Sequence, residues 1–299
     1  MTTAPQYSIL TDVVCVEVRG RDAGAFLHGQ LSQALADLDA TQAPLAAWHD
    51  AKGRVRALVR VLRLPDRWLL VGPRDGSELL VNKLRMFVLR AEVTLSVAND
   101  VAIAAVIDAD DAWLTAAGIP RDTEPNRAVE HRGVHLVRVG PSYWQALGDP
   151  AALAQLTGSL KAAPPGAAAL AEIRLGIPSI TTALAERFIA QMLNLDELGA
   201  VSFDKGCYPG QEIIARVHNL GGVKRRVRRY GAEGAAAELK TAIVAADGAA
   251  VGEVVRSAPN GVGSEVLAVV DHAAAGAALA TSTGAQLRAL PLPFDVPRD

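Results

Sequence analysis

The last part of the chain, after about residue 220, is a series of short apolar stretches with almost no helical spacing. Their residues alternate as in strands, and Gly, Asp and Asn separate one stretch from the next, as is typical of turns. Short strands at such close spacing bury their apolar faces when the sheet closes on itself. We therefore predict a small C-terminal β-barrel, with strands at 224–230, 241–246, 251–256, 265–271 and 285–290.

The preceding residues mix helical and strand periodicity and contain no internal repeat, which indicates a mixed α+β body. Asp22 can cap a helix with Phe26, Leu27, Leu31, Leu35 and Leu38 on one face, and a second helix is expected at 77–90. A loop at 161–168 leads into a short helix that ends near Gly176. Extended segments are expected at 13–18, 53–64, 67–72, 92–98, 101–107 and 133–146.

Length and composition exclude several classes of protein. With 299 residues, 50% of them hydrophobic, the chain can bury a sizeable core and is long enough for two or three domains. No run approaches the roughly 18 apolar residues of a membrane span, and the start lacks the pattern of a secretory signal. The two cysteines, Cys15 and Cys207, cannot form a disulfide framework or hold an iron–sulfur cluster with four thiolates. We expect a cytoplasmic protein with no membrane partner.

The segment 201–222 differs from the rest of the chain because it combines a cysteine with turn-forming residues. Gly206 and Gly210 bracket Cys207, so the backbone must turn tightly there. Helical spacing then begins at Gly210 and stops at Gly221. Cys207 would thus lie before a helix N-terminus and near Lys205, and both favour the thiolate form. The alternative is a small buried residue in a turn, which is also our expectation for Cys15 in its apolar strand.

The string 205–212, Lys-Gly-Cys-Tyr-Pro-Gly-Gln-Glu, resembles the signature K-G-C-[FY]-x-G-Q-E of the YgfZ-type folate-binding proteins. That family is related to the glycine-cleavage aminomethyltransferase and supports iron–sulfur enzymes, including enzymes that modify tRNA. The resemblance runs in order from residue 20 to about 230. Further matches lie at 26–32, 52–54, 188–196, 199–203, 215–216 and 222–225.

The resemblance implies an α+β, three-lobed aminomethyltransferase-like (GcvT-like) fold around a folate-sized cavity. It further implies a folate-binding region at 1–222, with a ferredoxin-like subdomain at about 45–100, and a C-terminal β-barrel domain at 223–299. Cys207 would be the catalytic thiol, the cofactor would be tetrahydrofolate or a derivative, and no metal would be bound. By the same resemblance, the cofactor-binding residues would be Lys205, Gly206, Tyr208, Gln211, Glu212, Arg216, Gln191, Asn194, Glu172 and Arg54.

Two positions depart from the pattern of the aminomethyltransferases. Where they carry an aspartate that orients the folate, this chain has Arg56 and Ala57, so proton handling for carbon transfer lacks an obvious agent. Where the family more often has an acidic residue two before Gly176, this chain has Arg174, with Glu172 two residues earlier. The first departure disfavours aminomethyl transfer, and the second leaves folate recognition either shifted or weakened.

Basic residues gather in two segments although the net charge of the chain is −2. Both could be solvated strand faces, or they could form an electropositive rim for the tail of a folate or for RNA phosphates. Aromatic residues are only 4% of the chain, so any tRNA contact would be weak and electrostatic. The segments are Lys52, Arg54, Arg56, Arg60 and Arg63, and Arg216, Lys224, Arg225, Arg226, Arg228 and Arg229.

Three functions remain open from the sequence. The first is a folate-binding accessory protein, not a conventional enzyme, that supports iron–sulfur cluster assembly or repair in client enzymes such as those that methylthiolate tRNA. The second is a folate-dependent one-carbon (aminomethyl) transferase, against which Arg56 and Ala57 stand. The third is an RNA-binding chaperone that uses the basic segments. Histidines show no metal-ligand spacing, and no nucleotide-phosphate loop occurs.

Overall fold

The structure, a computed structural model, describes residues 4–121 and 123–297. By its internal contacts the chain forms two compact units, the first of Met1–Ala46 and Leu58–Ala168, the second of Ala47–Ala57 and Ala169–Asp299. Residues 169–222 thus belong to the same compact unit as the C-terminal strands, and the domain boundary at residue 222 stays a prediction. Within the described residues, every helix is too short or too polar to cross a membrane.

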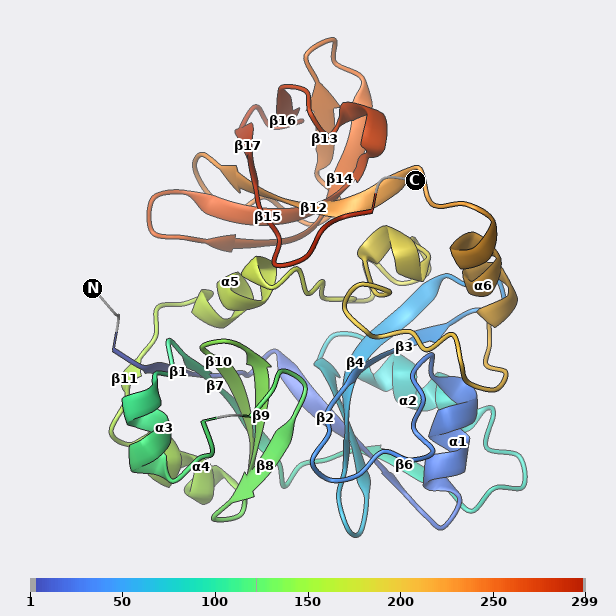
Figure 1. Cartoon of the computed structure of the whole chain (residues 1–299), viewed down its shortest axis with the longest axis vertical. Helices are drawn as coiled ribbons and strands as arrows, with labels where there is room; N and C mark the ends of the chain where they lie inside the picture. The colour runs from blue at the N-terminus through green and yellow to red at the C-terminus, as the bar shows by residue number, and fades with distance from the viewer. Residues whose placement is uncertain (1–3, 122, 298–299) are drawn as a thin grey trace. The chain divides into compact units, whose positions relative to one another are not determined.

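The first unit contains a six-stranded sheet with helices α3 and α4 against it (Figure 1). Trp113 of α3 and Leu153 of α4 pack with Trp144 and Leu136 of the sheet in one buried cluster. Asp110 caps α3 through the backbone N–H of Trp113. The strand order is β11-β1-β7-β10-β9-β8, with β1 Gln6–Ile9, β7 Ala102–Ile107, β8 Ala128–His131, β9 Val134–Gly140, β10 Tyr143–Gly148 and β11 Lys161–Ala162; the helices are α3 Asp111–Ala117 and α4 Pro150–Thr157.

A second sheet, of five strands, has the order β3-β4-β5-β2-β6. Helix α2 buries Leu80, Val81 and Leu84, and it contacts β2 and β6. The ends of β3 and β4, residues 47–57, continue into the second unit. The elements are β2 Val13–Arg19, α1 Ala23–Gln30, β3 Leu45–His49, β4 Val55–Arg63, β5 Trp68–Pro73, α2 Ser77–Arg85 and β6 Thr94–Val97.

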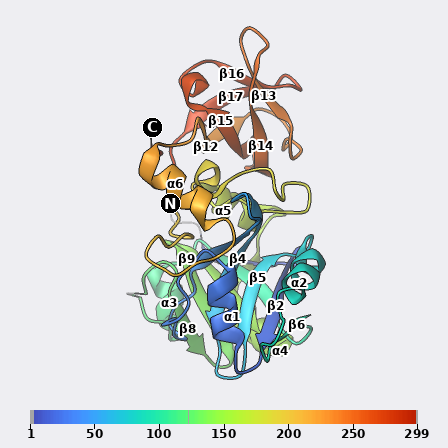
Figure 2. The ribbon, with the colours of Figure 1, turned by 90° about the vertical axis from the view of Figure 1, so that its right-hand side faces the viewer.

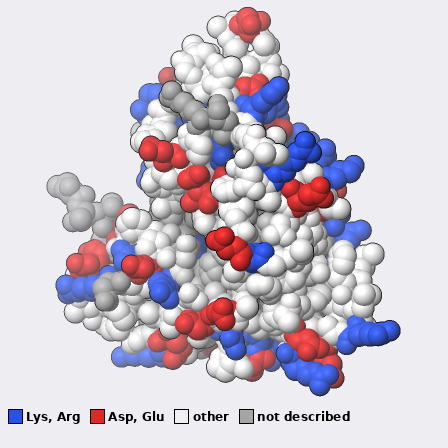
Figure 3. Space-filling model, turned by 45° about the vertical axis from the view of Figure 1, so that its right-hand side comes forward, with Lys and Arg blue, Asp and Glu red and all other residues white. Residues whose placement is uncertain are grey.

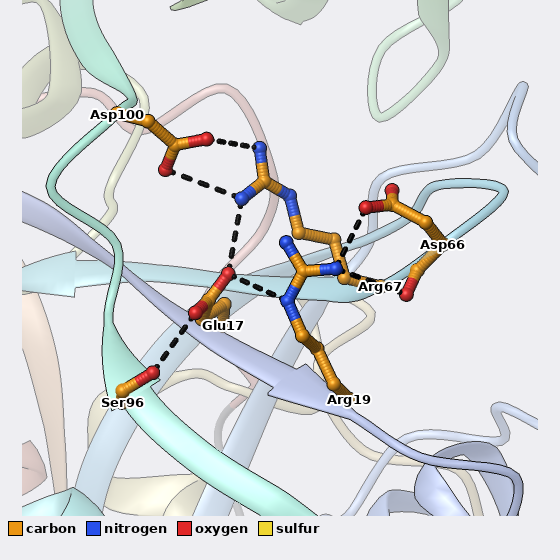
Figure 4. A network of polar contacts seen from close by, with 6 residues as sticks. All are labelled: Glu17, Arg19, Asp66, Arg67, Ser96 and Asp100. Atoms are coloured by element: carbon orange, nitrogen blue, oxygen red, sulfur yellow. Dashed lines mark hydrogen bonds and ion pairs between the residues drawn. The ribbon is translucent and has the colours of Figure 1, made fainter.

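A network of ion pairs joins strands of this second sheet (Figure 4). The carboxylate of Glu17 on β2 accepts hydrogen bonds from Arg67 at 3.0 Å, Arg19 at 3.1 Å and Ser96 at 2.9 Å. Arg67 also pairs with Asp100 at 2.8 Å. Burial alone would raise the pKa of Glu17, but these hydrogen bonds together lower it below its ordinary value. Glu17 therefore stays ionised in the fold although its side chain is largely covered.

The C-terminal strands form a closed six-stranded barrel, coloured orange to red in Figures 1 and 2. Tyr230, Ile243, Val254 and Val266 fill its interior from four different strands. The predicted barrel is therefore confirmed, with β16 as an additional strand. The second unit consists of α5 Ala167–Arg174 (from residue 169), η1 Ala190–Leu193, α6 Gln211–Leu220, β12 Arg225–Ala232, β13 Ala242–Ala245, β14 Ala250–Pro259, β15 Ser264–Asp271, η2 His272–Ala274, β16 Leu279–Thr281 and β17 Gln286–Leu290.

Several predicted elements differ from the structure. The helix after Asp22 ends at Gln30, because Leu31 is extended and the ring of His28 accepts a hydrogen bond from the Leu35 backbone N–H at 3.1 Å. Leu35 and Leu38 are still buried, but from a loop and not from a helix face. The segment 133–146 is not one strand but the hairpin of β9 and β10. Strands β1, β3, β8 and β11 and helices α3 and α4 were not predicted.

Candidate functional site

The site is built on the tight turn between β3 and β4. One oxygen of Asp50 accepts hydrogen bonds from the backbone N–H groups of Lys52 and Arg54, each at 2.8 Å. Gly53 has a left-handed φ of 73°, which a residue with a side chain adopts at a cost. The side chain of Asp50 thus replaces the backbone hydrogen bonds that a turn leaves open, and it fixes the conformation of residues 50–54.

The segment that carries Cys207 lies directly on this turn. Gly210 has φ 81°, and a Cβ atom there would lie 2.5 Å from the carbonyl oxygen of Asp50 and 2.7 Å from the Cα of Gly53. A Cβ atom on Gly53 would in turn meet Ile213 at 3.2 Å. Only glycine permits this approach, so the two glycines bring together segments that lie far apart in the sequence.

Cys207 is exposed and lies four residues before Gln211, the first residue of α6, whereas Cys15 is buried in β2. The side-chain amide of Gln211 donates a hydrogen bond to the Lys205 carbonyl at 3.3 Å, which closes the turn around the thiol. The interpretation of Cys207 as a buried turn residue is therefore wrong. The expectation for Cys15 is confirmed, and burial raises the pKa of its thiol to about 12.

Two other side chains of the same turn, those of Lys205 and Tyr208, lie next to each other. The ammonium of Lys205 lies 5.0 Å from the ring centre of Tyr208, a distance at which a cation and an aromatic ring attract each other. Partial burial lowers the pKa of Lys205 to about 8 and raises the pKa of Tyr208 to about 12. The amine is thus close to titration at physiological pH, beside an exposed thiol.

Buried polar groups without hydrogen-bond partners lie next to this turn. The ring of His49, at the end of β3, is 1% exposed and 6.0 Å from the ring of Tyr208. Within residues 4–121 and 123–297, both ring nitrogens of His49 and the hydroxyl of Tyr208 have no hydrogen-bond partner, and neither does the indole N–H of Trp48. Burial lowers the pKa of His49 to about 3, so the ring is neutral and offers one donor and one acceptor. Such groups are costly to bury unless something pairs with them.

Arg54 and Arg56 contact Glu186, a residue to which the sequence assigned no role. The carboxylate of Glu186 pairs with Arg56 at 2.7 Å, and its backbone carbonyl accepts from Arg54 at 3.3 Å. The guanidinium of Arg56 also lies 4.9 Å from the ring centre of Trp48. Arg56 is therefore held between a carboxylate and an indole, at the position where aminomethyltransferases are expected to have an acidic residue.

Gln191 and Asn194 act within the protein core. Gln191 is 1% exposed and donates to the carbonyl of Ile214 in α6 at 2.8 Å. Asn194 is 0% exposed, ends η1 with φ 54° and donates to the carbonyl of Val227 in β12 at 2.9 Å. These amides join η1 to α6 and to the barrel, so they hold in position the helix that follows the Cys207 turn.

Glu172 and Arg174 of α5 contact the barrel. The carboxylate of Glu172 pairs with Arg256 at 2.5 Å, and Arg174 pairs with Glu265 at 2.9 Å. Glu265 also accepts from Arg229, so two guanidinium groups surround one carboxylate. The side chain of Arg174, the second departure from the family pattern, is thus used to hold α5 against β15.

The structure brings five of the predicted site residues into the turn itself, namely Lys205, Gly206, Cys207, Tyr208 and Gln211. Arg54 lies in the neighbouring turn, which Gly210 contacts, and Glu212 and Arg216 lie on α6. The sequence did not identify Trp48, His49 or Glu186 as parts of the site. His49 and Glu186 contact Tyr208 and Arg56, more than 100 residues away, and no local pattern marks them.

The two basic segments are largely paired inside the protein. Arg60 is buried and donates to the Asn126 side chain at 2.7 Å, so it does not lie on a solvated strand face. In the second segment, Arg225 pairs with Asp271 and Arg226 with Asp196. On the face drawn in Figure 3, basic and acidic side chains lie interspersed. A continuous electropositive rim is absent from that face.

Comparison with known proteins adds two findings. The chain is 29% identical over 224 residues to the tRNA-modifying protein YgfZ of Edwardsiella ictaluri, which covers 72% of this chain and 68% of the relative. It is 28% identical over 223 residues to the protein of that name from Colwellia psychrerythraea, with the same coverage. By sequence, this chain is thus similar to the YgfZ-type proteins. No family model matches it.

The fold of this YgfZ relative is that of an aminomethyltransferase. The crystal structure of the glycine cleavage system aminomethyltransferase T from Bartonella henselae superposes with a TM-score of 0.76, at 17% sequence identity. The match covers 99% of this chain and 88% of that protein. The predicted α+β, aminomethyltransferase-like fold is confirmed, and at this identity the likeness concerns the fold alone.

Proposed function

We propose that this YgfZ relative is a folate-binding accessory protein of the cytoplasm that supports tRNA-modifying iron–sulfur enzymes. The observation that carries the proposal is the exposed Cys207, held before helix α6 by the contact of Gly210 with the Asp50 turn. The names of the relatives supply the connection with tRNA modification. The chain itself supplies one accessible sulfur and a polar, partly buried setting for it.

The unpaired polar groups beside the turn suit a reduced folate. The edge of a pterin presents both hydrogen-bond donors and acceptors, and the His49 ring, the Tyr208 hydroxyl and the Trp48 N–H provide both kinds of group. Lys205 supplies positive charge for a glutamate tail, and since its pKa is about 8 it is mostly protonated at neutral pH. A bound folate would supply one-carbon and reducing chemistry. The residues of this chain would bind and orient it and would exclude water.

Cys207 is the group that we assign to the iron–sulfur client. One thiolate cannot hold a cluster alone, so Cys207 would act together with ligands of the client enzyme, for which the cluster is cargo. Its exposure permits contact with a partner chain, whereas Cys15 is enclosed. Folate binding and client contact would therefore use neighbouring but different atoms of the same turn.

Complementation with Cys207→Ala tests this proposal. In a strain that lacks the protein, the variant should fail to restore tRNA methylthiolation, measured by mass spectrometry of tRNA nucleosides. Purified Cys207→Ala should still bind 5-formyltetrahydrofolate with an affinity within about two-fold of the wild type, because an exposed side chain contributes little to packing. Full rescue by Cys207→Ala would remove the thiol from the proposal.

A matched pair of measurements separates the accessory role from one-carbon transfer. His49→Phe removes the buried donor and acceptor, and we expect it to weaken folate binding at least ten-fold while Cys207 is unchanged. In the same preparations, formation of methylenetetrahydrofolate from an aminomethyl donor should stay at background, since Arg56 and Ala57 stand where a carboxylate is needed. Turnover in that assay would replace the accessory role by a transferase.

A further inference from the structure

A cavity lies near the C-terminal end of α6, in the same compact unit as Cys207. It has a volume of about 1000 Å³, within the range of sites for small organic molecules. Its lining includes Val217 near the end of α6 and Gly222 just after it, whereas Cys207 precedes the helix. None of the residues assigned to the folate site lines this cavity. The cavity does border the predicted folate residue Arg54, because Ile189 forms an antiparallel β-bridge with Arg54 and the Phe188 carbonyl accepts a hydrogen bond from the Val55 N–H at 2.8 Å.

The interior of this α6 cavity is mostly apolar. Phe188 and Met192 contribute an aromatic ring and a flexible thioether, and the second can adapt to the shape of a ligand. Transfer of an apolar ligand from water into this cavity would be favourable, and its free energy would grow with the apolar area that becomes buried. The apolar lining consists of Phe188, Ile189, Met192, Val217, Val223 and Ala273.

The charges around the α6 cavity add up to one unpaired cation. Arg187 pairs with Glu253 at 2.6 Å, and Arg225 pairs with Asp271 at 2.5 Å. All four of these residues line the cavity, so two cations and two carboxylates neutralise each other. Lys224 also lines it, is exposed, and has no ion pair or side-chain hydrogen bond within the described residues. A ligand with a single negative charge would balance it.

We propose that the α6 cavity binds an amphipathic organic monoanion, a small molecule with an acyl or aromatic body and one acid group that pairs with Lys224. The apolar lining takes the body, and the ion pairs on either side leave no second cation for a further acid group. A second acid group on the ligand would find no unpaired cation among the described lining residues and would lie near the already paired carboxylates of Glu253 and Asp271. This site is independent of Cys207 and goes beyond the proposed function.

Fluorescence titration with 11-(dansylamino)undecanoic acid and with its uncharged methyl ester tests the proposal. Wild-type protein should bind the acid with a Kd in the micromolar range, and the ester more weakly. Lys224→Met should weaken binding of the acid about two- to five-fold, the effect of one exposed ion pair, and leave the ester unchanged. Lys161→Met, on the exposed strand β11 of the other unit, is the matched control and should change neither.

Ala273→Trp narrows the cavity and should weaken binding of both probes, with folding checked by the thermal melt. Undetectable binding of the acid to wild-type protein at 100 µM probe, or an acid titration that Lys224→Met leaves unchanged, would overturn the proposal. Affinities for both probes that a folded Ala273→Trp leaves unchanged would place the probe elsewhere and overturn it equally. Titration of the same variants with 5-formyltetrahydrofolate should show wild-type affinity, so failure here and failure of the folate proposal are distinguishable.

Discussion

At the scale of single residues, the two glycines that bracket Cys207 occupy very different surroundings. Gly210 has φ 81° and touches the backbone of Asp50 and Gly53, whereas Gly206 has nothing within 4 Å of a Cβ position. They look equivalent in the sequence, since each is a glycine in a turn. The structure shows that one fixes the contact between two segments and that the other leaves the thiol open.

Replacement of Gly210 by alanine should therefore be costly, and the matched Gly206→Ala change should not. The left-handed conformation alone costs roughly 1–2 kcal/mol for a residue with a side chain, and the 2.5 Å approach to the Asp50 oxygen adds to it. We expect Gly210→Ala to lower the free energy of unfolding in urea by at least about 2 kcal/mol. Equal losses for the two variants would show that the close approach does not matter.

His49 should make stability depend on pH. Its pKa is about 3 in the fold, because burial opposes the charged ring, against 6.5 in the unfolded chain. The unfolded chain therefore takes up a proton that the fold does not, so stability is complete above pH 6.5 and falls as the pH drops below it. The slope approaches about 1.4 kcal/mol per pH unit.

Urea unfolding at about pH 7 and about pH 5 measures this effect, in a range above the titration of most carboxylates. His49→Phe should remove most of the difference in unfolding free energy between the two pH values. His135→Asn is the comparison variant, because burial also lowers the pKa of His135 but this ring is only half-buried, so its replacement should change the pH dependence less. If the pH dependence of His49→Phe equals that of the wild type, the ring is not neutral in the fold.

The parts of the site that could be predicted are those that are local in the sequence. The Lys205-to-Gln211 string marks the turn and the start of α6, and both lie where the spacing indicated. Trp48, His49 and Glu186 could not be found this way. His49 and Glu186 matter because of Tyr208 and Arg56, which lie more than 100 residues away, and such proximity arises only when the chain folds.

At the scale of elements, the short helix η1 connects the site to the barrel. Asn194 ends this helix with a left-handed φ of 54°, and its side-chain amide is buried. The amide bonds to β12, and Gln191 of the same turn bonds to α6. A helix of four residues thereby holds two larger elements in position.

Asn194→Ala should weaken this connection. It leaves the buried Val227 carbonyl without its side-chain donor and places alanine in a left-handed conformation, which together should cost about 2–4 kcal/mol of unfolding free energy. Asn194→Gly loses the same hydrogen bond but tolerates the φ angle, so it should cost about 1 kcal/mol less than alanine. The difference between the two variants, measured in urea, isolates the backbone contribution. Equal stability would contradict the strain at this position.

Periodicity predicted elements well where one face alone is buried. The barrel strands alternate between a packed interior and an outer face, and five of the six were predicted from that alternation. The first helix was predicted too long because Leu35 and Leu38 continue its spacing, yet both are buried from a loop. Burial of apolar residues by a loop leaves the same pattern in a sequence as burial by a helix.

At the scale of the whole molecule, charge is balanced both in total and locally. The net charge of −2 results from 30 basic and 32 acidic residues, and the arginines of the two basic segments are largely used within the protein. The sequence shows that these residues are clustered, but it cannot show that each has a carboxylate or carbonyl within reach. Their pairing depends on the tertiary fold.

Binding to tRNA should therefore be weak and should depend only moderately on salt. Lys52, Arg216 and Lys224 are exposed residues of the two segments whose side chains have no ion pair or side-chain hydrogen bond within the described residues. If these three are the main phosphate contacts, the plot of log K against log salt should have a slope of about −3. Filter binding at several salt concentrations measures it, and combining Lys52→Ala, Arg216→Ala and Lys224→Ala should flatten it. A slope steeper than about −5 would mean that the paired arginines open to bind RNA.

The two cysteine side chains differ in their accessibility to reagents. Cys207 is open to reagents, whereas Cys15 is enclosed in β2 and resists ionisation. The native chain consequently carries a single attachment point for a dye, a spin label or a crosslinker, without any engineering. A probe placed there would sit on the turn that Gly210 holds in place, so it would report directly on anything that approaches this part of the surface.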